Sequence, residues 1–264
     1  MDQNTHKQRM KQMRVRSPLF SATNQRFNII ILAAGLGTRL KPATDFIPKA
    51  LVEIGGPRAI DYCIEKYQYI SGRIIIAAGY SSDLLINYVS GKYPSLNLFF
   101  SIEDVSELKG PGTSLLYALD YASSRLPTII TFCDYIVGDQ FSVEYDGIGV
   151  CKPTEDQSVL GTYDTVAEIE EGFAVDLVKN KDRENVRENG FTGISVCHNT
   201  KLLKSITYGA DVSKKDTEQL DYTLDIIKGY IKRVKTAAIP LSKLYEFGTD
   251  DILQETRRQL NENI

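Results

Sequence analysis

The segment that decides the fold is NIIILAAGLGTRLKPATDFIPKALVEIGG, residues 28–56. With Phe27 it opens on a continuous apolar run, which is typical of a strand buried on both faces of a parallel sheet. The run ends at two alanines and is followed by the turn GLGTR, residues 35–39. Lys49 stands ten positions after Arg39, so a glycine turn and two cations follow directly on the buried strand.

This order of residues predicts a site for a polyphosphate. Ligands of open α/β sheets bind at the carboxyl ends of the strands, where this turn would lie. Backbone amides at glycines can approach phosphate oxygens closely because no Cβ stands in the way. Arg39 offers a planar fork of donors that suits phosphate, and Lys49 adds a compact positive charge.

Two familiar phosphate-binding motifs are excluded. A dinucleotide fingerprint needs G-x-G-x-x-G, and its third glycine position is occupied here by Leu40. A P-loop needs G-x-x-x-x-G-K-[ST], which the sequence does not contain.

The pattern outward from this segment predicts alternating strands and helices up to about residue 140. Apolar runs predict strands at residues 27–34, 73–79, 96–100 and 127–132, and helices are expected between them, from Pro57, from Ser81 or Ser82 to Val89, and over residues 113–123. Such alternation predicts crossover connections and a parallel sheet. The expected fold is a Rossmann-like, three-layer α/β/α arrangement with a mainly parallel mixed sheet.

In the second half of the chain, strands and helices no longer alternate regularly. Shorter strands are expected in YDGIGVCK, GTYDTVAEIEEGFAVDLV and GFTGISVC, with a hairpin turn at Glu170-Glu171-Gly172. A helix is expected over residues 216–230, a strand in RVKTAAIPL, and a last helix that begins at Thr249-Asp250-Asp251.

Composition limits the class of protein. The 264 residues are 42% hydrophobic and 25% charged, as in an ordinary globular protein, and no apolar stretch is long enough to span a bilayer. The N-terminus lacks the apolar core of a secretory signal, and the four cysteines form no C-x-x-C pair, so we expect a cytoplasmic protein with reduced thiols.

Charge divides the chain unevenly. Residues 1–26 carry a net charge of +5 within an overall charge of −3, which leaves −8 on the rest. We expect residues 1–26 to be a disordered basic arm and residues 27–264 to form a single domain. The arm lacks the interleaved aromatic residues of nucleic-acid sites, so no nucleic-acid partner is expected, and no membrane partner either.

The motif L-A-A-G-x-G-T-R-L followed by P-K-A-L-V-E-I-G-G resembles the signature of the nucleotidyltransferases that activate sugar 1-phosphates, the pyrophosphorylase family. The resemblance extends over roughly residues 27–263 and is most specific in the first third. It implies the fold of the nucleotide-diphospho-sugar transferases, with a nucleotide-binding half at 27–140 and an acceptor-binding half at 141–264.

The resemblance also implies roles for particular residues. Arg39, Lys49 and Asp134 correspond to catalytic positions, and Asp134 ends a buried strand in a Cys-Asp-Tyr context where the family commonly has Gly-Asp-Asn. Lys181 and Gly193 would bind the acceptor phosphate, with Lys179 as a rival because the usual Glu-Lys-Pro context is absent. The residues implied in nucleotide binding are Leu32, Ala34, Gly35, Gly37, Thr38, Arg39, Gly112 and Thr113.

The reaction that the resemblance implies joins a nucleoside triphosphate to a sugar 1-phosphate and releases pyrophosphate. Mg²⁺ is the implied cofactor, held by Asp134 and by Glu246, which replaces the family's usual aspartate two residues before Gly248. The partners are then a nucleoside triphosphate and a phosphorylated small-molecule acceptor, and a homo-oligomer is left open. Two alternatives also stay open: the same chemistry on a non-sugar phosphomonoester, as in the phosphocholine cytidylyltransferase-like branch, and a non-catalytic, nucleotide-binding regulatory subunit.

Overall fold

A computed structural model describes residues 25–104, 110–151, 165–179, 189–209, 222–242 and 244–262. Nearly all of the expected basic arm therefore lies outside the described residues, as does Lys181. None of the helices in the described ranges is long and apolar enough to cross a membrane.

The first half of the chain forms a parallel sheet at the positions where the apolar runs predicted strands. The strands lie in the order β3-β2-β1-β4, and all three pairings between them are parallel. Their bounds are β1 (Phe27–Leu32), β2 (Ser71–Ala78), β3 (Leu98–Ile102) and β4 (Thr128–Phe132). All six residues of β1 are buried, as a central strand requires.

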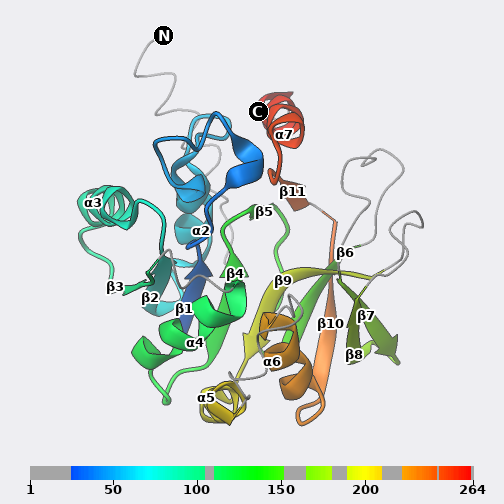
Figure 1. Cartoon of the computed structure of the whole chain (residues 1–264). Coiled ribbons are helices and arrows are strands. Elements are labelled where there is room, and N and C mark those ends of the chain that lie inside the picture. The colour runs from blue at the N-terminus through cyan, green and yellow to red at the C-terminus, as the bar shows by residue number, and fades with distance from the viewer. Residues whose placement is uncertain are drawn as a thin grey trace.

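The second half continues the same sheet with mostly antiparallel neighbours. The order runs on from β4 as β9-β6-β10-β8-β7, and only β6 and β10 pair in parallel (Figure 1). These strands are β6 (Gly147–Cys151), β7 (Thr165–Glu170), β8 (Phe173–Lys179), β9 (Gly190–Cys197) and β10 (Thr236–Leu241). The predicted hairpin turn joins β7 to β8, and both central residues, Glu171 and Gly172, have positive φ.

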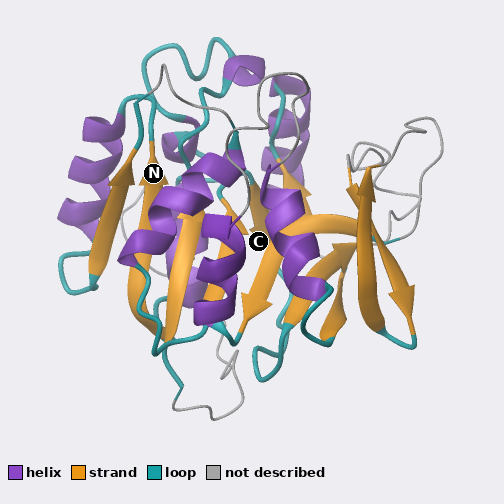
Figure 2. Ribbon diagram, turned by 60° about the horizontal axis from the view of Figure 1, so that its bottom comes forward, coloured by secondary structure: helices purple, strands orange, loops and turns teal. Residues whose placement is uncertain are grey.

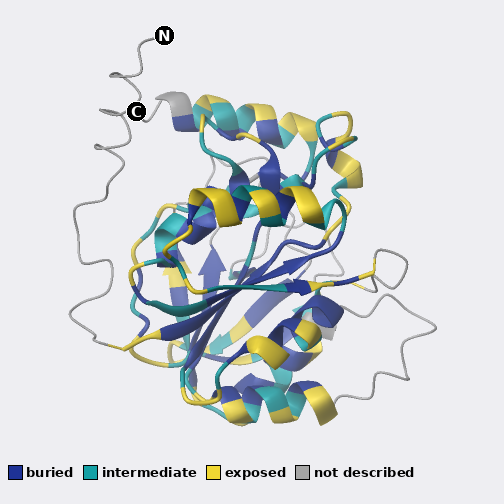
Figure 3. Cartoon of the chain, turned by 90° about the vertical axis from the view of Figure 1, so that its left-hand side faces the viewer, coloured by how far each residue is buried: buried dark blue, intermediate teal, exposed yellow. Residues whose placement is uncertain are grey.

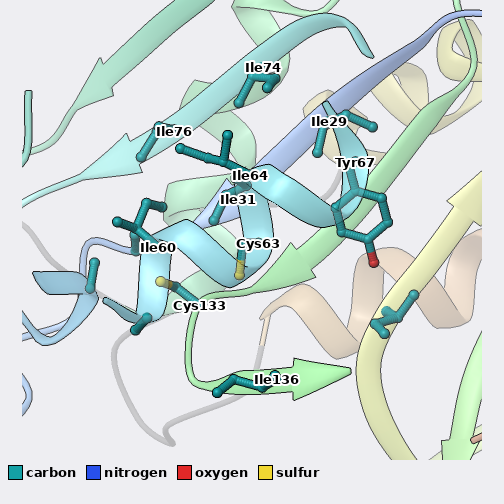
Figure 4. Packing of buried hydrophobic residues seen from close by; sticks show 14 of the residues in the cluster. Ile29, Ile31, Ile60, Cys63, Ile64, Tyr67, Ile74, Ile76, Cys133 and Ile136 are labelled. Carbon is teal, nitrogen blue, oxygen red and sulfur yellow. The ribbon is translucent and has the colours of Figure 1, made fainter. Parts of the chain in front are cut away.

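Helices cover both faces of the sheet, which confirms the predicted three layers (Figures 2 and 3). One face packs against α2 (Ala59–Tyr67), α3 (Ser82–Lys92) and α7 (Asp250–Glu262). The other face packs against α4 (Pro111–Tyr121), α5 (Thr200–Gly209) and α6 (Tyr222–Ile231). Figure 4 shows α2 on the sheet, with Ile64 beside the buried isoleucines of β1 and β2 and Cys63 on the side of Cys133. All four cysteines are free and buried.

Two short strands and one α-helix of the described residues were not predicted from the sequence. The strands β5 (Tyr135–Val137) and β11 (Leu244–Glu246) form a small antiparallel sheet of their own, and α5 follows β9. The predicted cap of α3 also differs, because Ser81 adopts a left-handed conformation with φ of 49° and its side chain makes no capping hydrogen bond.

Candidate active site

The glycine turn follows β1 as predicted and is tightly held. Gly37 has φ of +64° and precedes a short 3₁₀ helix, Thr38–Leu40. The Thr44 hydroxyl donates a hydrogen bond of 2.8 Å to the Gly37 carbonyl. A Cβ at Gly37 would lie 3.0 Å from the Thr44 methyl group and 3.2 Å from the Cβ of Lys49, so the backbone angle and the close packing both require glycine.

A cleft of about 410 Å³ opens above this turn at the carboxyl ends of β1 and β4. It brings together side chains and backbone from five separate segments of the chain. Its lining consists of Leu32, Ala33, Ala34, Gly35, Leu36, Gly37, Thr38, Arg39, Lys49, Ala50, Gly110, Pro111, Ser114, Phe132, Cys133, Asp134 and Gly248.

Lys49 and Asp134, 85 positions apart in the sequence, form an ion pair in this cleft. The Lys49 Nζ donates to the Asp134 Oδ2 at 3.2 Å, and the same ammonium lies 5.3 Å from the centroid of the Phe247 ring. The other carboxylate oxygen of Asp134, Oδ1, is buried and has no hydrogen-bond partner among the described residues. Because a buried acceptor is costly to leave unpaired, Oδ1 is the atom of Asp134 that could hold a ligand.

Arg39 lies in the 3₁₀ helix on the rim of the same cleft, with its side chain exposed. The cleft therefore carries two cations, one exposed at its rim and one beside a carboxylate, within reach of a glycine turn. This is the arrangement that the sequence predicted for a polyphosphate site.

The small sheet holds the segment after Asp134. Tyr135 in β5 pairs with Glu246 in β11, so the backbone of Glu246 lies beside the residue that follows Asp134. The side chain of Glu246 is outside the described part of the structure. Gly248, two residues further on, does line the cleft.

Lys66 supports this small sheet from α2. Its Nζ donates to the carbonyl oxygens of Val137 at 3.0 Å and Asp139 at 2.6 Å, and it lies 5.3 Å from the centroid of the Phe141 ring. Burial lowers the pKa of Lys66 from 10.5 to about 8, and the negative charge of Asp139 opposes that shift. This lysine's position was not predictable from the sequence, because its partners are carbonyl groups of a distant segment.

Three other predicted site residues, Gly112, Thr113 and Gly193, lie next to residues that line the cleft but do not line it themselves. Gly112 and Thr113 lie buried in the first turn of α4 and are flanked by Pro111 and Ser114, which line the cleft. Gly193 lies within β9 with φ of +77°, and a Cβ there would stand 2.1 Å from a ring carbon of Phe132.

Sequence reasoning missed Phe132. Phe132 is the last residue of β4 and lines the cleft, a position that the strand "TIITF" could have indicated.

The fold and the cleft together define an α/β protein whose cleft, at the carboxyl ends of parallel strands, carries two cations and a carboxylate. Residues 29–141 match the family model of the MobA-like NTP transferase domain. This range covers the glycine turn, Lys49 and Asp134. The predicted resemblance to the nucleotidyltransferases is therefore confirmed, and it is carried by the first half of the chain.

Two curated relatives each match less than half of the chain. A UTP–glucose-1-phosphate uridylyltransferase of Haloferax volcanii is 28% identical over 93 residues, which are 35% of this chain and 37% of the relative. A 2-aminoethylphosphonate cytidylyltransferase of Lancefieldella rimae is 30% identical over 117 residues, which are 44% of this chain and 46% of the relative. The match thus spans less than half the length of either relative.

A solved structure extends the likeness to most of the chain. The CTP:phosphocholine cytidylyltransferase of Streptococcus pneumoniae superimposes with a TM-score of 0.71 and 22% identity, over 89% of this chain and 99% of that protein. This likeness confirms the predicted fold in both halves.

Proposed function

We propose that this chain is a nucleotidyltransferase that joins a nucleoside triphosphate to a phosphomonoester and releases pyrophosphate. A phosphate oxygen of the acceptor attacks the α-phosphorus of the triphosphate in line with the leaving pyrophosphate. The observation that carries the proposal is the convergence of Arg39, Lys49 and Asp134 on one cleft beside the glycine turn. The match of the same segment to an NTP transferase domain supports it.

The chain's own residues act by positioning and by charge. An acceptor phosphate is already ionised at neutral pH, so the attack needs no general base, and none of the proposed roles falls to a histidine. Arg39 binds the phosphates that leave as pyrophosphate. Lys49 lies further in and offsets the charge that accumulates between the two anions, an effect of the kind whose removal costs roughly 10²–10³ in rate.

Asp134 fits a magnesium ion. Mg²⁺ in such sites usually takes one or two carboxylates and completes its shell with water and phosphate oxygens. The buried Oδ1 of Asp134, which has no partner among the described residues, is the donor that such an ion requires, and Glu246 would supply a second carboxylate. When bound, the ion would offset the negative charge of the reacting phosphates.

The acceptor is proposed to bind in the second half of the chain, at residues 141–264, with Lys181 and Gly193 near its phosphate. A sugar 1-phosphate is the first candidate, since one relative is named for glucose 1-phosphate. A non-sugar acceptor is the alternative, because the other relative and the structural neighbour are named for 2-aminoethylphosphonate and phosphocholine. The four free, buried cysteines suit a protein of the reducing cytoplasm, where we propose that the reaction takes place.

A pyrophosphate-release screen tests the proposal. Four nucleoside triphosphates are combined with a panel of sugar 1-phosphates and non-sugar phosphomonoesters in the presence of Mg²⁺. We expect one combination to release pyrophosphate and to form a nucleoside-diphospho product, and EDTA to abolish turnover. Undiminished turnover in EDTA would remove the metal role of Asp134, whereas triphosphate binding without any turnover would favour a regulatory subunit.

A further inference from the structure

The main sheet has one open edge among the described residues. At one end of the sheet, β7 turns back and also pairs with β9, where the Ala167 N–H donates to the Asn189 carbonyl at 2.9 Å. At the other end, β3 pairs with β2 alone, and β3 and α3 form the left-hand end of the molecule in Figure 1. Proteins usually cover, shorten or charge such an edge, because its backbone groups can pair with another strand.

The sequence of the edge strand lacks the usual protections. Residues 96–102, LNLFFSI, carry no charge and no proline, and β3 pairs with β2 without a bulge. Leu98 and Phe100 are half-buried, and Ile102 is 61% exposed. An uncharged, apolar strand at an open edge indicates that a further strand pairs with it.

The backbone groups that face the open edge belong to alternate residues of β3. The Asn97 carbonyl accepts a hydrogen bond from the Ile74 N–H of β2 at 2.9 Å, so the groups of Asn97 face β2. Successive residues of a strand direct their N–H and C=O groups to opposite sides. The groups of Leu98, Phe100 and Ile102 therefore face away from β2, toward the open edge.

We infer that a second copy of this chain covers the edge, with the two β3 strands antiparallel about a twofold axis at Phe100. In this register each Phe100 pairs with its symmetry mate, and the Ile102 N–H donates to the Leu98 carbonyl of the second copy. The Leu98 N–H is not needed, since it already donates to the Leu96 carbonyl at 3.0 Å. The exposed Ile102 side chain would lie beside Leu98 of the second copy, which removes apolar surface from water. The inference does not depend on the proposed reaction.

The charges beside the edge favour the antiparallel arrangement. The helix α3 connects the parallel strands β2 and β3, so it runs opposite to both, and its first turn lies at the carboxyl end of β3. Asp83 is exposed in this first turn. Lys92 is in the last turn, where it is 35% exposed and lies 2.7 Å from the Asp61 carboxylate. Antiparallel pairing sets the first turn of one α3 toward the last turn of the other, so opposite charges meet, whereas parallel pairing sets like charges together.

The chemistry of the edge suits a second copy of the same strand. Because residues 96–102 carry no charge, a twofold axis brings no like charges together within the strand pair. On the face of β3 that α4 covers, the Phe99 ring lies 6.2 Å from the ring of Tyr121 and 5.0 Å from the Arg73 guanidinium. Tyr121 is 41% exposed, and tyrosine and arginine are the side chains that contribute most often to protein interfaces.

Sedimentation equilibrium of the full chain without substrates, over about 1–100 μM, tests the inference. We expect the wild-type chain to approach twice the 29.6 kDa mass of one chain. Ile102→Lys should raise the dissociation constant of the dimer by roughly tenfold or more, because it buries a charge beside Leu98 of the second copy. Val175→Lys is the matched control and should leave the constant within about twofold. Val175 is 37% exposed in β8, and β8 has a paired strand on each side.

Asp83→Lys tests the direction of the two strands. In the antiparallel arrangement it turns two symmetric attractive pairs into repulsive ones, so the dimer should weaken by roughly two- to tenfold. An unchanged or tighter dimer in Asp83→Lys would overturn the antiparallel arrangement.

Hydrogen exchange of the wild-type chain gives a second readout at the edge itself. The amides of Phe100 and Ile102 face the open edge, so they should exchange more slowly at about 100 μM than at about 1 μM. If Ile102→Lys lacks a cooperative thermal transition, this measurement decides alone. Exchange of these amides that is independent of concentration would overturn the inference.

The remaining outcomes identify other occupants of the edge. A wild-type chain that stays monomeric at about 100 μM, or a dimer that Ile102→Lys leaves intact, would overturn the inference. A chain that dimerises only after deletion of residues 1–24 would overturn it as well and would assign the edge to the basic arm. None of these results bears on the proposed function, which pyrophosphate release tests separately.

Discussion

Gly193 shows how a single residue connects the acceptor half of the sheet to the cleft. The family resemblance predicted a Thr-Gly pair at this place for the acceptor phosphate. In the structure, Gly193 has φ of +77° within β9 and leaves the space that the Phe132 ring fills. Because Phe132 lines the cleft, the missing side chain at Gly193 fixes the position of one cleft wall.

A glycine-to-alanine pair tests this relation. Gly193→Ala would place a Cβ 2.1 Å from a Phe132 ring carbon, whereas Gly172→Ala, at φ of +84°, would meet no atom within 4 Å. Gly172→Ala should cost only the backbone strain of a left-handed residue, about 1–2 kcal/mol. Gly193→Ala should cost roughly 1–3 kcal/mol more, because overpacking is added. Urea unfolding of both variants measures the difference, and equal losses would show that Phe132 moves aside without penalty.

At the scale of elements, the small sheet of β5 and β11 positions the proposed metal site. Lys66 caps the carbonyl groups of Val137 and Asp139, on either side of the turn that leaves β5. Asp139 in turn accepts hydrogen bonds from the backbone N–H of Ser242 at 2.6 Å and from its hydroxyl at 2.9 Å. One lysine of α2 and one aspartate thus connect the segments that carry Asp134 and Glu246.

The lowered pKa of Lys66 predicts a pH dependence of stability. The folded chain releases this proton near pH 8 and the unfolded chain near 10.5, so the unfolded state holds more protons between these values and stability rises with pH there. Between pH 7.5 and 9.5 the gain should be at most about 2 kcal/mol. Urea unfolding at both pH values should show this gain in the wild type and not in Lys66→Met. Lys41→Met, at an exposed lysine, is the control and should keep the gain; a gain that persists in Lys66→Met would assign it to another group.

Elements with strong local patterns were predictable, and those that depend on distant partners were not. The strands of the parallel half match the predicted runs within about two residues, because Ile29, Ile75 and Ile130 belong to continuous apolar segments. In contrast, β5 and β11 have three residues each and exist because they pair with each other across more than a hundred positions. A strand of three residues is too short for the alternation of apolar and polar residues to be recognised in the sequence.

The same division holds for the candidate site. Arg39, Lys49 and Asp134 were predictable, since the first two belong to one local motif and Asp134 ends a buried strand. All three line one cleft, as that prediction requires, and their roles stay a prediction. Phe132 was missed, because its significance arises from the cavity left by Gly193. Such features come from packing and leave no motif in the sequence.

On the scale of the whole molecule, one sheet joins two halves with different pairing. The parallel half, from β3 to β4, carries the cleft residues Arg39, Lys49 and Asp134. The largely antiparallel half, from β9 to β7, carries the segments proposed for the acceptor. Because β4 and β9 are directly paired, a ligand that spans the cleft would contact both halves.

This division predicts that removing a cation from one half has a different kinetic effect from removing a cation from the other half. Arg39→Ala should mainly lower kcat, by roughly 10²–10³, because it removes a group that binds the leaving phosphates. Lys181→Ala should raise the acceptor KM and leave triphosphate binding nearly intact. Calorimetry with the triphosphate and saturation kinetics with the acceptor measure the two effects separately.

Lys179→Ala is the comparison for Lys181→Ala. Lys179 is the last residue of β8 and would take the acceptor role if the resemblance were displaced by two residues. An acceptor defect in Lys179→Ala alone would move the proposed phosphate contact to the end of that strand. If neither variant changes the acceptor KM, the acceptor is bound by other residues, and the contacts proposed for the antiparallel half are wrong while those of the parallel half stand.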